Sequence, residues 1–196
     1  KVAQAQGCKV QDQSASLAQI AIQGPASRDI LAAAGLADLT TLKIRHCLDA
    51  TLCGHSLLVT RTGYTGELGY ELYLPAAGAP TVWDRLLEAG RPLGIKPAGL
   101  GARDLLRLEM AYLLYGNDMN EETTPIEAGA EWVVKFDKGD FIGRTELLAQ
   151  QSQGAARRLV AFELVEKAVP RHGFKILSAQ VPHAEIGEVT SGNLSN

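Results

Sequence analysis

The chain has 196 residues, of which 46% are hydrophobic and 21% charged, and its formal net charge at pH 7 is -3. This balance is typical of a globular protein and argues against a disordered chain. No basic run is longer than Arg157-Arg158, so binding to nucleic acid or to an anionic membrane through clustered positive charge is not expected. No apolar run approaches 18 residues and no secretory signal pattern occurs, so neither a membrane-spanning helix nor an exported protein is predicted.

The first half of the chain alternates strand and helix patterns. Residues 17–24 (LAQIAIQG) alternate as a half-buried strand does. A helix is predicted for residues 25–34, with Pro25 in its first turn and Gly35 just past its end. Two or three strands separated by glycine turns are predicted within residues 41–75, and an amphipathic helix over residues 79–90. This order predicts an α+β unit with a ferredoxin-like sheet covered by helices on one face.

The second half is predicted from shorter signals. Leu106, Met110 and Leu113 recur at helical spacing, which predicts a helix within residues 97–116 that ends at Gly116. We expect a loop rich in Asx turns at 117–129, a short strand at 130–136 (AEWVVKF) and a helix from Arg144 to about Gln150. Residues 151–156 resemble a linker, and short strands from residue 157 onward (RRLVAFEL, RHGFKI, AEIGEVTSG) predict the start of a barrel or sandwich.

The segment 61–75, RTGYTGELGYELYLP, has glycines at intervals of three residues. Neither the dinucleotide fingerprint nor the phosphate loop has this spacing, and a strand follows it instead of a helix. A hairpin explains the segment better, because glycines permit positive φ and close backbone approach. Strand alternation then turns Glu71 and Tyr73 away from Tyr70, Leu72 and Leu74. From the pattern alone, Glu71 is either a solvated charge or the floor of a site for a flat, hydrogen-bonding heterocycle.

Two arginines, Arg103 and Arg107, lie one turn apart on the predicted helix. A guanidinium presents a fork of N–H donors that matches the two oxygens of a carboxylate, so the pair suits a carboxylate-bearing ligand. The alternative is a surface pair that interacts with acidic neighbours such as Asp104 and Glu109.

No metal site or nucleophile is predicted. The loop 117–122 lacks the glycine and the final glutamate of a calcium-binding loop. The histidines are scattered and none pairs with a nearby cysteine or serine in a nucleophile pattern; they are His46, His55, His172 and His183. The three cysteines, Cys8, Cys47 and Cys53, have no C-x-x-C spacing and are interpreted as buried or free thiols of a reducing, cytoplasmic compartment.

Four stretches together resemble the T-protein of the glycine cleavage system, a tetrahydrofolate-dependent aminomethyltransferase. They are LAQIAIQGPASRDIL, RTGYTGELGYELYLP, the long segment from GLGARDLLRLEM to FIGRTELL, and GEVTSGNLS. The resemblance implies a ferredoxin-like α+β part (1–95), a second α/β part (96–153) and the start of a jelly-roll-like barrel (154–196). It also implies transfer of a methylene group from the aminomethylated lipoyl arm of the H-protein to tetrahydrofolate, with release of ammonia.

The resemblance assigns roles to four residues. Glu71 falls on the glutamate that hydrogen-bonds the pterin, whose amino group and ring N–H a carboxylate can accept together. Arg103 falls on a folate-contacting arginine, and Trp132 falls on an aromatic residue near the folate. Tyr64 is a weaker candidate for a folate contact, and a structural role in the turn is its competing interpretation. For Trp132 a buried core position is the competing interpretation.

The family's catalytic aspartate and a folate-contacting asparagine have no counterpart in this chain, because both precede the segment that matches Lys1. We therefore expect a fragment without its N-terminal segment or the end of its barrel, with no catalytic residue of its own. The folate domains of sarcosine and dimethylglycine dehydrogenases, a dimethylsulfoniopropionate demethylase and a non-catalytic folate-binding module are the alternatives. Lys138-Gly139-Asp140 stands where the iron-sulfur-related folate-binding relatives carry a cysteine, which argues against those relatives.

Overall fold

The structure of the protein is a computed structural model that describes residues 7–36 and 38–194. The chain divides into two units, residues 1–99 and residues 100–196. Helices and strands occur in both units, so the α+β class is confirmed. Residues 1–6 and 195–196, which belong to the first and last expected domains, lie outside the described residues. The expected boundaries at residues 95 and 153 stay a prediction.

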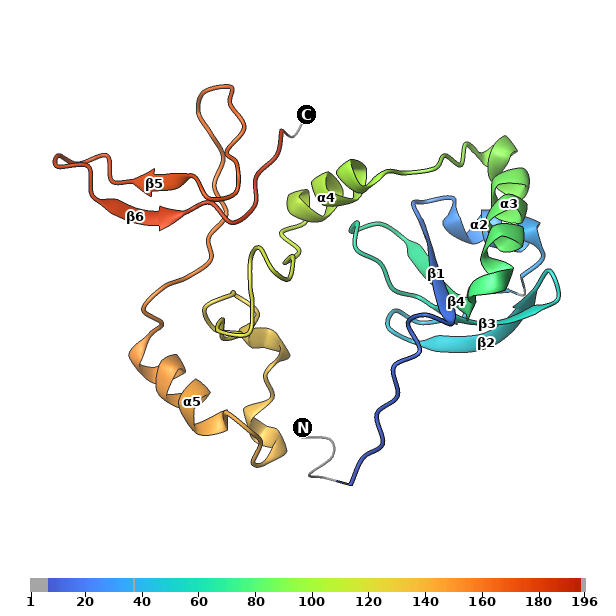
Figure 1. The fold of residues 1–196 in the computed structure, drawn as a ribbon, viewed down its shortest axis with the longest axis horizontal. Coiled ribbons are helices and arrows are strands. Elements are labelled where there is room, and N and C mark those ends of the chain that lie inside the picture. Colours follow the sequence, from blue (N-terminus) through green and yellow to red (C-terminus); the bar gives the residue numbers. More distant parts are fainter. Residues whose placement is uncertain (1–6, 37, 195–196) are drawn as a thin grey trace. The chain divides into compact units, whose positions relative to one another are not determined.

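The first unit is built on a four-stranded antiparallel sheet (Figure 1). Its spatial order is β1-β4-β3-β2, and the bounds of the strands are β1 Leu17–Gln23, β2 Cys47–Leu52, β3 His55–Thr60 and β4 Gly69–Pro75. In the register of β3 and β4, Leu58 lies opposite Tyr73 and Thr60 lies opposite Glu71. The predicted hairpin is therefore confirmed, and residues 61–68 of the glycine-rich segment form the connection between its two strands.

Helices α2 (Ser27–Ala34) and α3 (Ala79–Gly90) cover one face of this sheet (Figure 1). The alternating side chains of the strands and the inner faces of both helices form one apolar core, in which each buried aliphatic side chain contributes about 1.5–3 kcal/mol. Its most deeply buried members are Leu31, Val59, Tyr70, Leu72, Leu74 and Val82. Arg85 of α3 also donates to the Ala33 and Ala34 carbonyls at the end of α2, both at 3.0 Å.

Two turns follow directly from their residues. Gly35 ends α2 in the left-handed conformation (φ 109°), and its N–H bonds to the Ala32 carbonyl at 3.0 Å, as the sequence predicts. Cys53 and Gly54 both have positive φ, 52° and 78°, between β2 and β3. Two successive residues of positive φ make the tight hairpin turn whose twist matches that of the flanking strands.

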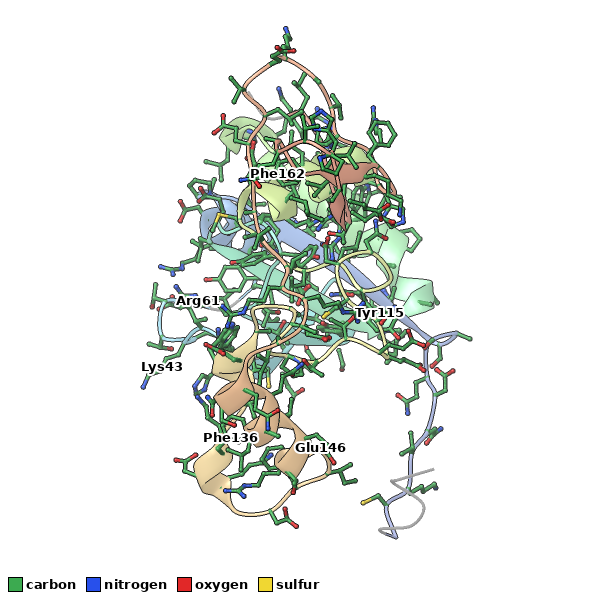
Figure 2. The ribbon with its side chains drawn as sticks, turned by 90° about the vertical axis from the view of Figure 1, so that its left-hand side faces the viewer. Lys43, Arg61, Tyr115, Phe136, Glu146 and Phe162 are labelled. Carbon is green, nitrogen blue, oxygen red and sulfur yellow. The ribbon has the colours of Figure 1, made fainter. Side chains whose placement is uncertain are left out.

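The second unit contains shorter elements. They are α4 (Leu100–Glu109), the 3-10 helices η3 (Glu131–Val133) and η4 (Phe136–Lys138), α5 (Arg144–Gln153) and an antiparallel pair of strands, β5 (Lys175–Leu177) and β6 (Glu185–Glu188). Figure 2 labels Phe136 in η4 and Glu146 in α5. Arg144 joins these two helices by donating from Nε and Nη2 to the Phe136 carbonyl at 3.3 and 3.2 Å. Among the described residues, the buried hydrophobic side chains of this unit are Ile126, Ala128 and Val189.

Three expectations for the second unit are wrong. The helix predicted within residues 97–116 ends at Glu109 instead of near Gly116, because Ala111 turns into the left-handed region (φ 53°). The Tyr112 N–H then bonds to the Arg107 carbonyl at 2.8 Å, which closes the helix end. The strand predicted at 130–136 is replaced by η3 and η4, and residues 157–164 form no strand; the structure pairs neither segment with a neighbouring strand.

Candidate functional site

Glu71 lies on the face of the sheet that α2 and α3 leave uncovered. Along β4, Tyr70, Leu72 and Leu74 are at most 1% exposed and point into the core, whereas Glu71 and Tyr73 are half-buried on the opposite face. The predicted alternation is therefore confirmed. A carboxylate that pointed into the core would need a buried cation as its partner. On the open face Glu71 needs no such partner, and a ligand can reach it there.

Three side-chain donors surround the Glu71 carboxylate. Gln19, on the neighbouring strand β1, donates from Nε2 to Glu71 Oε1 at 2.8 Å and to the Tyr73 hydroxyl at 3.1 Å. The hydroxyl of Thr62 donates to Glu71 Oε2, and the Tyr73 hydroxyl reaches the same oxygen at 3.4 Å. An ionised carboxylate only accepts hydrogen bonds, so the amide and the two hydroxyls match it. Glu71 is thus a positioned charge rather than a freely solvated one.

The hydroxyl of Tyr73 stays protonated at neutral pH. Burial raises the pKa of this phenol, and the neighbouring Glu71 carboxylate raises it further by charge repulsion and by accepting its hydrogen bond. Tyr73 therefore accepts from Gln19 and donates to Glu71, and it links the two strands across the open face.

Gln23, at the end of β1, explains two glycines of the segment 61–75, namely Gly63 in the connection between β3 and β4 and Gly69 at the start of β4. Its Nε2 donates to the carbonyls of Thr62 (3.3 Å) and Tyr70 (3.2 Å). A Cβ on Gly63 or on Gly69 would lie 2.1 or 1.7 Å from Gln23 Oε1, so both positions must lack a side chain while the amide stays there. In this connection only Gly66 has positive φ (81°). Positive φ therefore accounts for Gly66, whereas the space taken by the Gln23 side chain accounts for Gly63 and Gly69.

The other residues that the resemblance assigns lie on both units. Tyr64 is half-buried in the same connection as Gly63 and Gly66. Arg103 is exposed on α4, and Trp132 in η3 has 62% of its surface exposed, so the interpretation of Trp132 as a buried core residue is wrong. Glu71 and Tyr64 share the first unit, and Arg103 and Trp132 share the second; their roles toward a ligand stay predictions.

Arg107, the second arginine of the predicted pair, is a structural residue. It is 2% exposed and uses its whole guanidinium: Nε and Nη2 donate to Asp104 Oδ1 at 2.9 and 2.7 Å, and Nη1 donates to Asp118 Oδ2 at 2.6 Å. Nη1 and Nη2 also reach the Tyr112 carbonyl (3.2 Å) and the Ser191 hydroxyl (2.8 Å). The interpretation as an ion pair with Asp104 is confirmed, but only Arg107 is buried in it, because the Asp104 side chain is 42% exposed.

Asp118 completes this network from the loop that follows α4. It accepts from the Thr190 hydroxyl at 2.6 Å and from the Leu114 N–H at 2.9 Å. Burial by itself would raise the pKa of Asp118, but the hydrogen bonds from Thr190, Leu114, Ser191 and Arg107 outweigh it and hold this pKa below its ordinary value. These charge-assisted bonds therefore fix the start of the loop predicted at residues 117–129. Within the same loop, Asn120 forms the predicted Asx turn by accepting from the Glu122 N–H at 2.9 Å.

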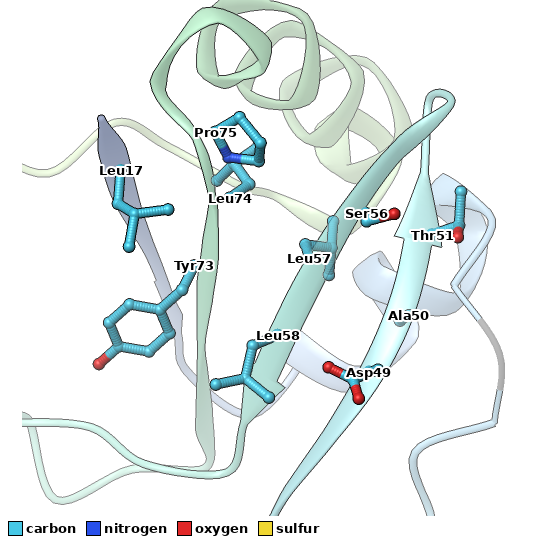
Figure 3. Close-up of a pocket in the computed structure, with 10 residues that line it drawn as sticks. All are labelled: Leu17, Asp49, Ala50, Thr51, Ser56, Leu57, Leu58, Tyr73, Leu74 and Pro75. Carbon is cyan, nitrogen blue, oxygen red and sulfur yellow. The ribbon is translucent and has the colours of Figure 1, made fainter. Parts of the chain in front are cut away.

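An open hollow of about 480 Å³ lies on the sheet of the first unit next to the Glu71 cluster. Leu17, Leu58 and Tyr73 line it together with Asp49, Thr51 and Ser56 (Figure 3). Tyr73 is common to the hollow and to the hydrogen-bonded cluster. A ligand bound at Glu71 has open surface beside it along the sheet.

Within the described residues, no group of three or more His, Cys, Asp and Glu side chains is arranged to hold a metal ion. All three cysteines are exposed, so the part of the prediction that has them buried is wrong. None of the helices described is both long enough and apolar enough to cross a bilayer.

Two residues of the cluster, Gln19 and Thr62, were not predicted. Gln19 is a polar residue within the apolar and small residues of β1, and it lies directly opposite Tyr73. Alternation places it on the open face, but its bond to Glu71 joins residues 52 positions apart. To predict this bond one would need to know that β1 pairs with β4, and the sequence pattern does not specify that pairing.

Comparison with known proteins assigns the family. The model of the GCVT N-terminal domain matches residues 1–138. An aminomethyltransferase of Halothermothrix orenii is 50% identical over 190 residues, which are 97% of this chain and 52% of the relative. Another from Caldanaerobacter subterraneus subsp. tengcongensis is 46% identical over 188 residues, 95% of this chain and 50% of the relative. The chain thus spans about half the length of the curated relatives it matches.

A solved structure also has a similar fold. The aminomethyltransferase T of the glycine cleavage system from Bartonella henselae superposes with a TM-score of 0.64 at 23% identity, covering 90% of this chain and 72% of that one. At this identity the likeness shows the fold alone. The family model, by contrast, spans the four-stranded sheet, including Glu71 on β4, and helix α4, and by that match the chain belongs to the GCVT N-terminal domain family.

Proposed function

We propose that this chain forms part of a tetrahydrofolate-dependent aminomethyltransferase of the glycine cleavage system. In that role it would take the methylene group from the aminomethylated lipoyl arm of the H-protein, pass it to tetrahydrofolate and release ammonia. The names of the relatives support the aminomethyltransferase activity. The observation that carries the proposal is the Glu71 carboxylate, held by Gln19, Thr62 and Tyr73 on the open face of the sheet.

Tetrahydrofolate is the acceptor substrate in this proposal, and Glu71 would bind its pterin. The pterin edge carries an amino group and a ring N–H side by side, and a carboxylate accepts from both, which gives stronger bonds than a neutral acceptor would. Arg103, Trp132 and Tyr64 are the further folate contacts that we propose from the family resemblance. Binding and orientation of the folate are the contributions of this chain, since no catalytic residue is assigned within it.

The finer architecture and the cellular location belong to the same proposal. We propose a ferredoxin-like part followed by a second α/β part and the beginning of a jelly-roll-like barrel, as in the family that the chain resembles. The mixed helices and strands of both units support the coarser α+β description. The location we propose is the cytoplasm.

The first test is the substitution Glu71→Gln in the full-length protein. It keeps the shape of the side chain but removes its charge, so tetrahydrofolate affinity is expected to fall by about 1–3 kcal/mol, or roughly 5- to 150-fold. Glu71 faces away from the core, so the fold should be retained. Titration calorimetry measures the affinity, and circular dichroism checks the fold.

Glu67→Gln is the matched control, because Glu67 is an exposed carboxylate in the connection that leads into β4. It should leave the affinity unchanged. If Glu71→Gln binds tetrahydrofolate as the unmodified protein does, Glu71 is not part of the folate site.

A second assay separates an enzyme from a non-catalytic folate-binding module. The full-length protein is mixed with aminomethylated H-protein, and ammonia release is measured with and without tetrahydrofolate. Release that depends on tetrahydrofolate supports the transferase. Tight folate binding without any release supports the binding module.

A further inference from the structure

We infer that Thr62 and Thr60 are positioning residues, whose hydroxyls form a chain that orients the Glu71 carboxylate toward its ligand. Both lie on the same side of Glu71, at the end of β3 and the start of the connection to β4. The inference rests on the proposed function, because it assigns Glu71 the binding of tetrahydrofolate. It adds that the position of the carboxylate is set by the protein before the ligand arrives.

The direction of the hydrogen bonds follows from counting protons. A threonine hydroxyl has one proton to donate, and the Thr62 proton is committed to Glu71 Oε2, because the carboxylate can only accept. The two hydroxyl oxygens of Thr60 and Thr62 are 2.6 Å apart. Thr60 is therefore the donor and Thr62 the acceptor in that bond. The Thr60 hydroxyl is 3.4 Å from the Glu71 carbonyl, which is a weaker alternative for its proton.

This chain makes the Thr62 hydroxyl a better donor than an isolated hydroxyl. Accepting a hydrogen bond polarises an O–H group and strengthens the bond that it donates. The carboxylate is then held from two sides, with Oε2 bonded to Thr62 from the connection and Oε1 bonded to Gln19 from β1. Both oxygens are anchored, so the side chain loses little further rotational freedom when a ligand binds.

The inference makes a graded prediction for tetrahydrofolate affinity in the full-length protein. Thr62→Val removes the hydroxyl at nearly constant volume and should weaken binding about 5- to 20-fold, because the ligand must then order the carboxylate. Thr62→Ser retains the hydroxyl and should stay within about twofold of the unmodified protein. Thr60→Val removes only the outer hydroxyl and should have an intermediate effect. The control is Thr41→Val, at an exposed position outside the strands.

A double substitution tests whether Thr62 acts through Glu71. If it does, Thr62→Val should cost less than about twofold in the Glu71→Gln background, since the oriented charge is already gone. A merely structural role would lower the affinity by the same factor in both backgrounds. Additive losses would therefore overturn the inference.

Other results also decide the question. Unchanged affinity of Thr62→Val, or a Thr62→Ser variant as weak as Thr62→Val, would overturn the inference while leaving Glu71 in the folate site. Unchanged affinity of Glu71→Gln would instead show that Glu71 is not part of the folate site, which removes the observation that carries the proposed function. If Thr62→Val does not fold, Thr60→Val alone and in the Glu71→Gln background gives the same comparison.

Discussion

Replacing Arg107 with methionine should open the second unit at the place where three segments of the chain meet. The Arg107 guanidinium joins α4 to Asp118 in the following loop and to Ser191 near the end of the chain. Methionine fills a similar volume but donates no hydrogen bond. The substitution therefore removes the bonds that hold these segments together and leaves Asp118 without its cation.

The size of the effect follows from the burial of the two carboxylates. The Asp118 side chain is 6% exposed, and breaking a buried ion pair on one side costs about 3–5 kcal/mol. The loss should lie near the lower end, because Asp118 keeps its bonds from Thr190 and from the Leu114 N–H. The Asp104 side chain is 42% exposed and is solvated again in the variant, so losing its ion pair with Arg107 adds little to the cost in stability.

Hydrogen exchange followed by mass spectrometry is the suitable assay, since it reports the opening of one segment without assuming that the whole chain unfolds in one step. If the free energy of local opening falls by about 3 kcal/mol, exchange in residues 112–119 and 188–192 should become roughly 100-fold faster. Arg157→Met is the control, because Arg157 is largely exposed and its pair with Glu127 spans 3.5 Å. It should change exchange in these segments by less than about fivefold.

Asp118→Asn, added to Arg107→Met, should restore part of the protection, because it removes the uncompensated charge. If Arg107→Met exchanges as slowly as Arg157→Met, the buried network does not hold these segments together.

Two further predictions concern the same unit. The pKa of Asp118 in the fold lies below its ordinary value of 3.8, so its bonds stabilise the unit above that pH, and this contribution is lost as the pH falls through the folded-state pKa. The protection factors of residues 112–119, which are corrected for the intrinsic exchange rate at each pH, should therefore fall below pH 3.8, and an Asp118→Asn variant with the same acid dependence would contradict this. Ala111 ends α4 with φ 53°, a conformation that is costly for any residue with a Cβ, so Ala111→Gly should stabilise this helix end by about 0.5–1 kcal/mol in urea unfolding, and destabilisation would show that the turn is not strained.

The first unit could be predicted from the sequence because its strongest signals are local. Alternation in β1 and β4, the glycine at position 35 and the short connection between β2 and β3 each act over a few residues. The alternation of β4 also predicts the face on which Glu71 lies. Alternation does not predict which residues of neighbouring segments contact Glu71. The contact with Gln19 depends on the pairing of β1 with β4, and the contact with Thr62 depends on the path of the connection.

The second unit was harder to predict because its conformation depends on distant polar contacts. The pattern of Leu106, Met110 and Leu113 continues the helix past residue 109, but Leu106 and Met110 are 40% and 46% exposed, so apolar burial does not decide where α4 ends. The helix end is closed by an alanine in a conformation usual for glycine. Just beyond the helix end, the Leu114 N–H donates to the Asp118 carboxylate. The sequence signals for helix ends do not include such a contact.

Arg103 and Arg107 show why spacing alone cannot separate a binding residue from a structural one. Both have the same charge and lie one turn apart on α4, so the pattern treats them alike. The structure distinguishes them by burial, because Asp118 and Ser191, the latter 84 positions along the chain, converge on Arg107 and leave Arg103 exposed. A guanidinium whose donors are satisfied by the fold has little left to offer a ligand, since binding one would break bonds that stabilise the unit. The structure therefore argues against Arg107 as a ligand-binding residue, and the contact of the exposed Arg103 with a carboxylate-bearing substrate stays a prediction.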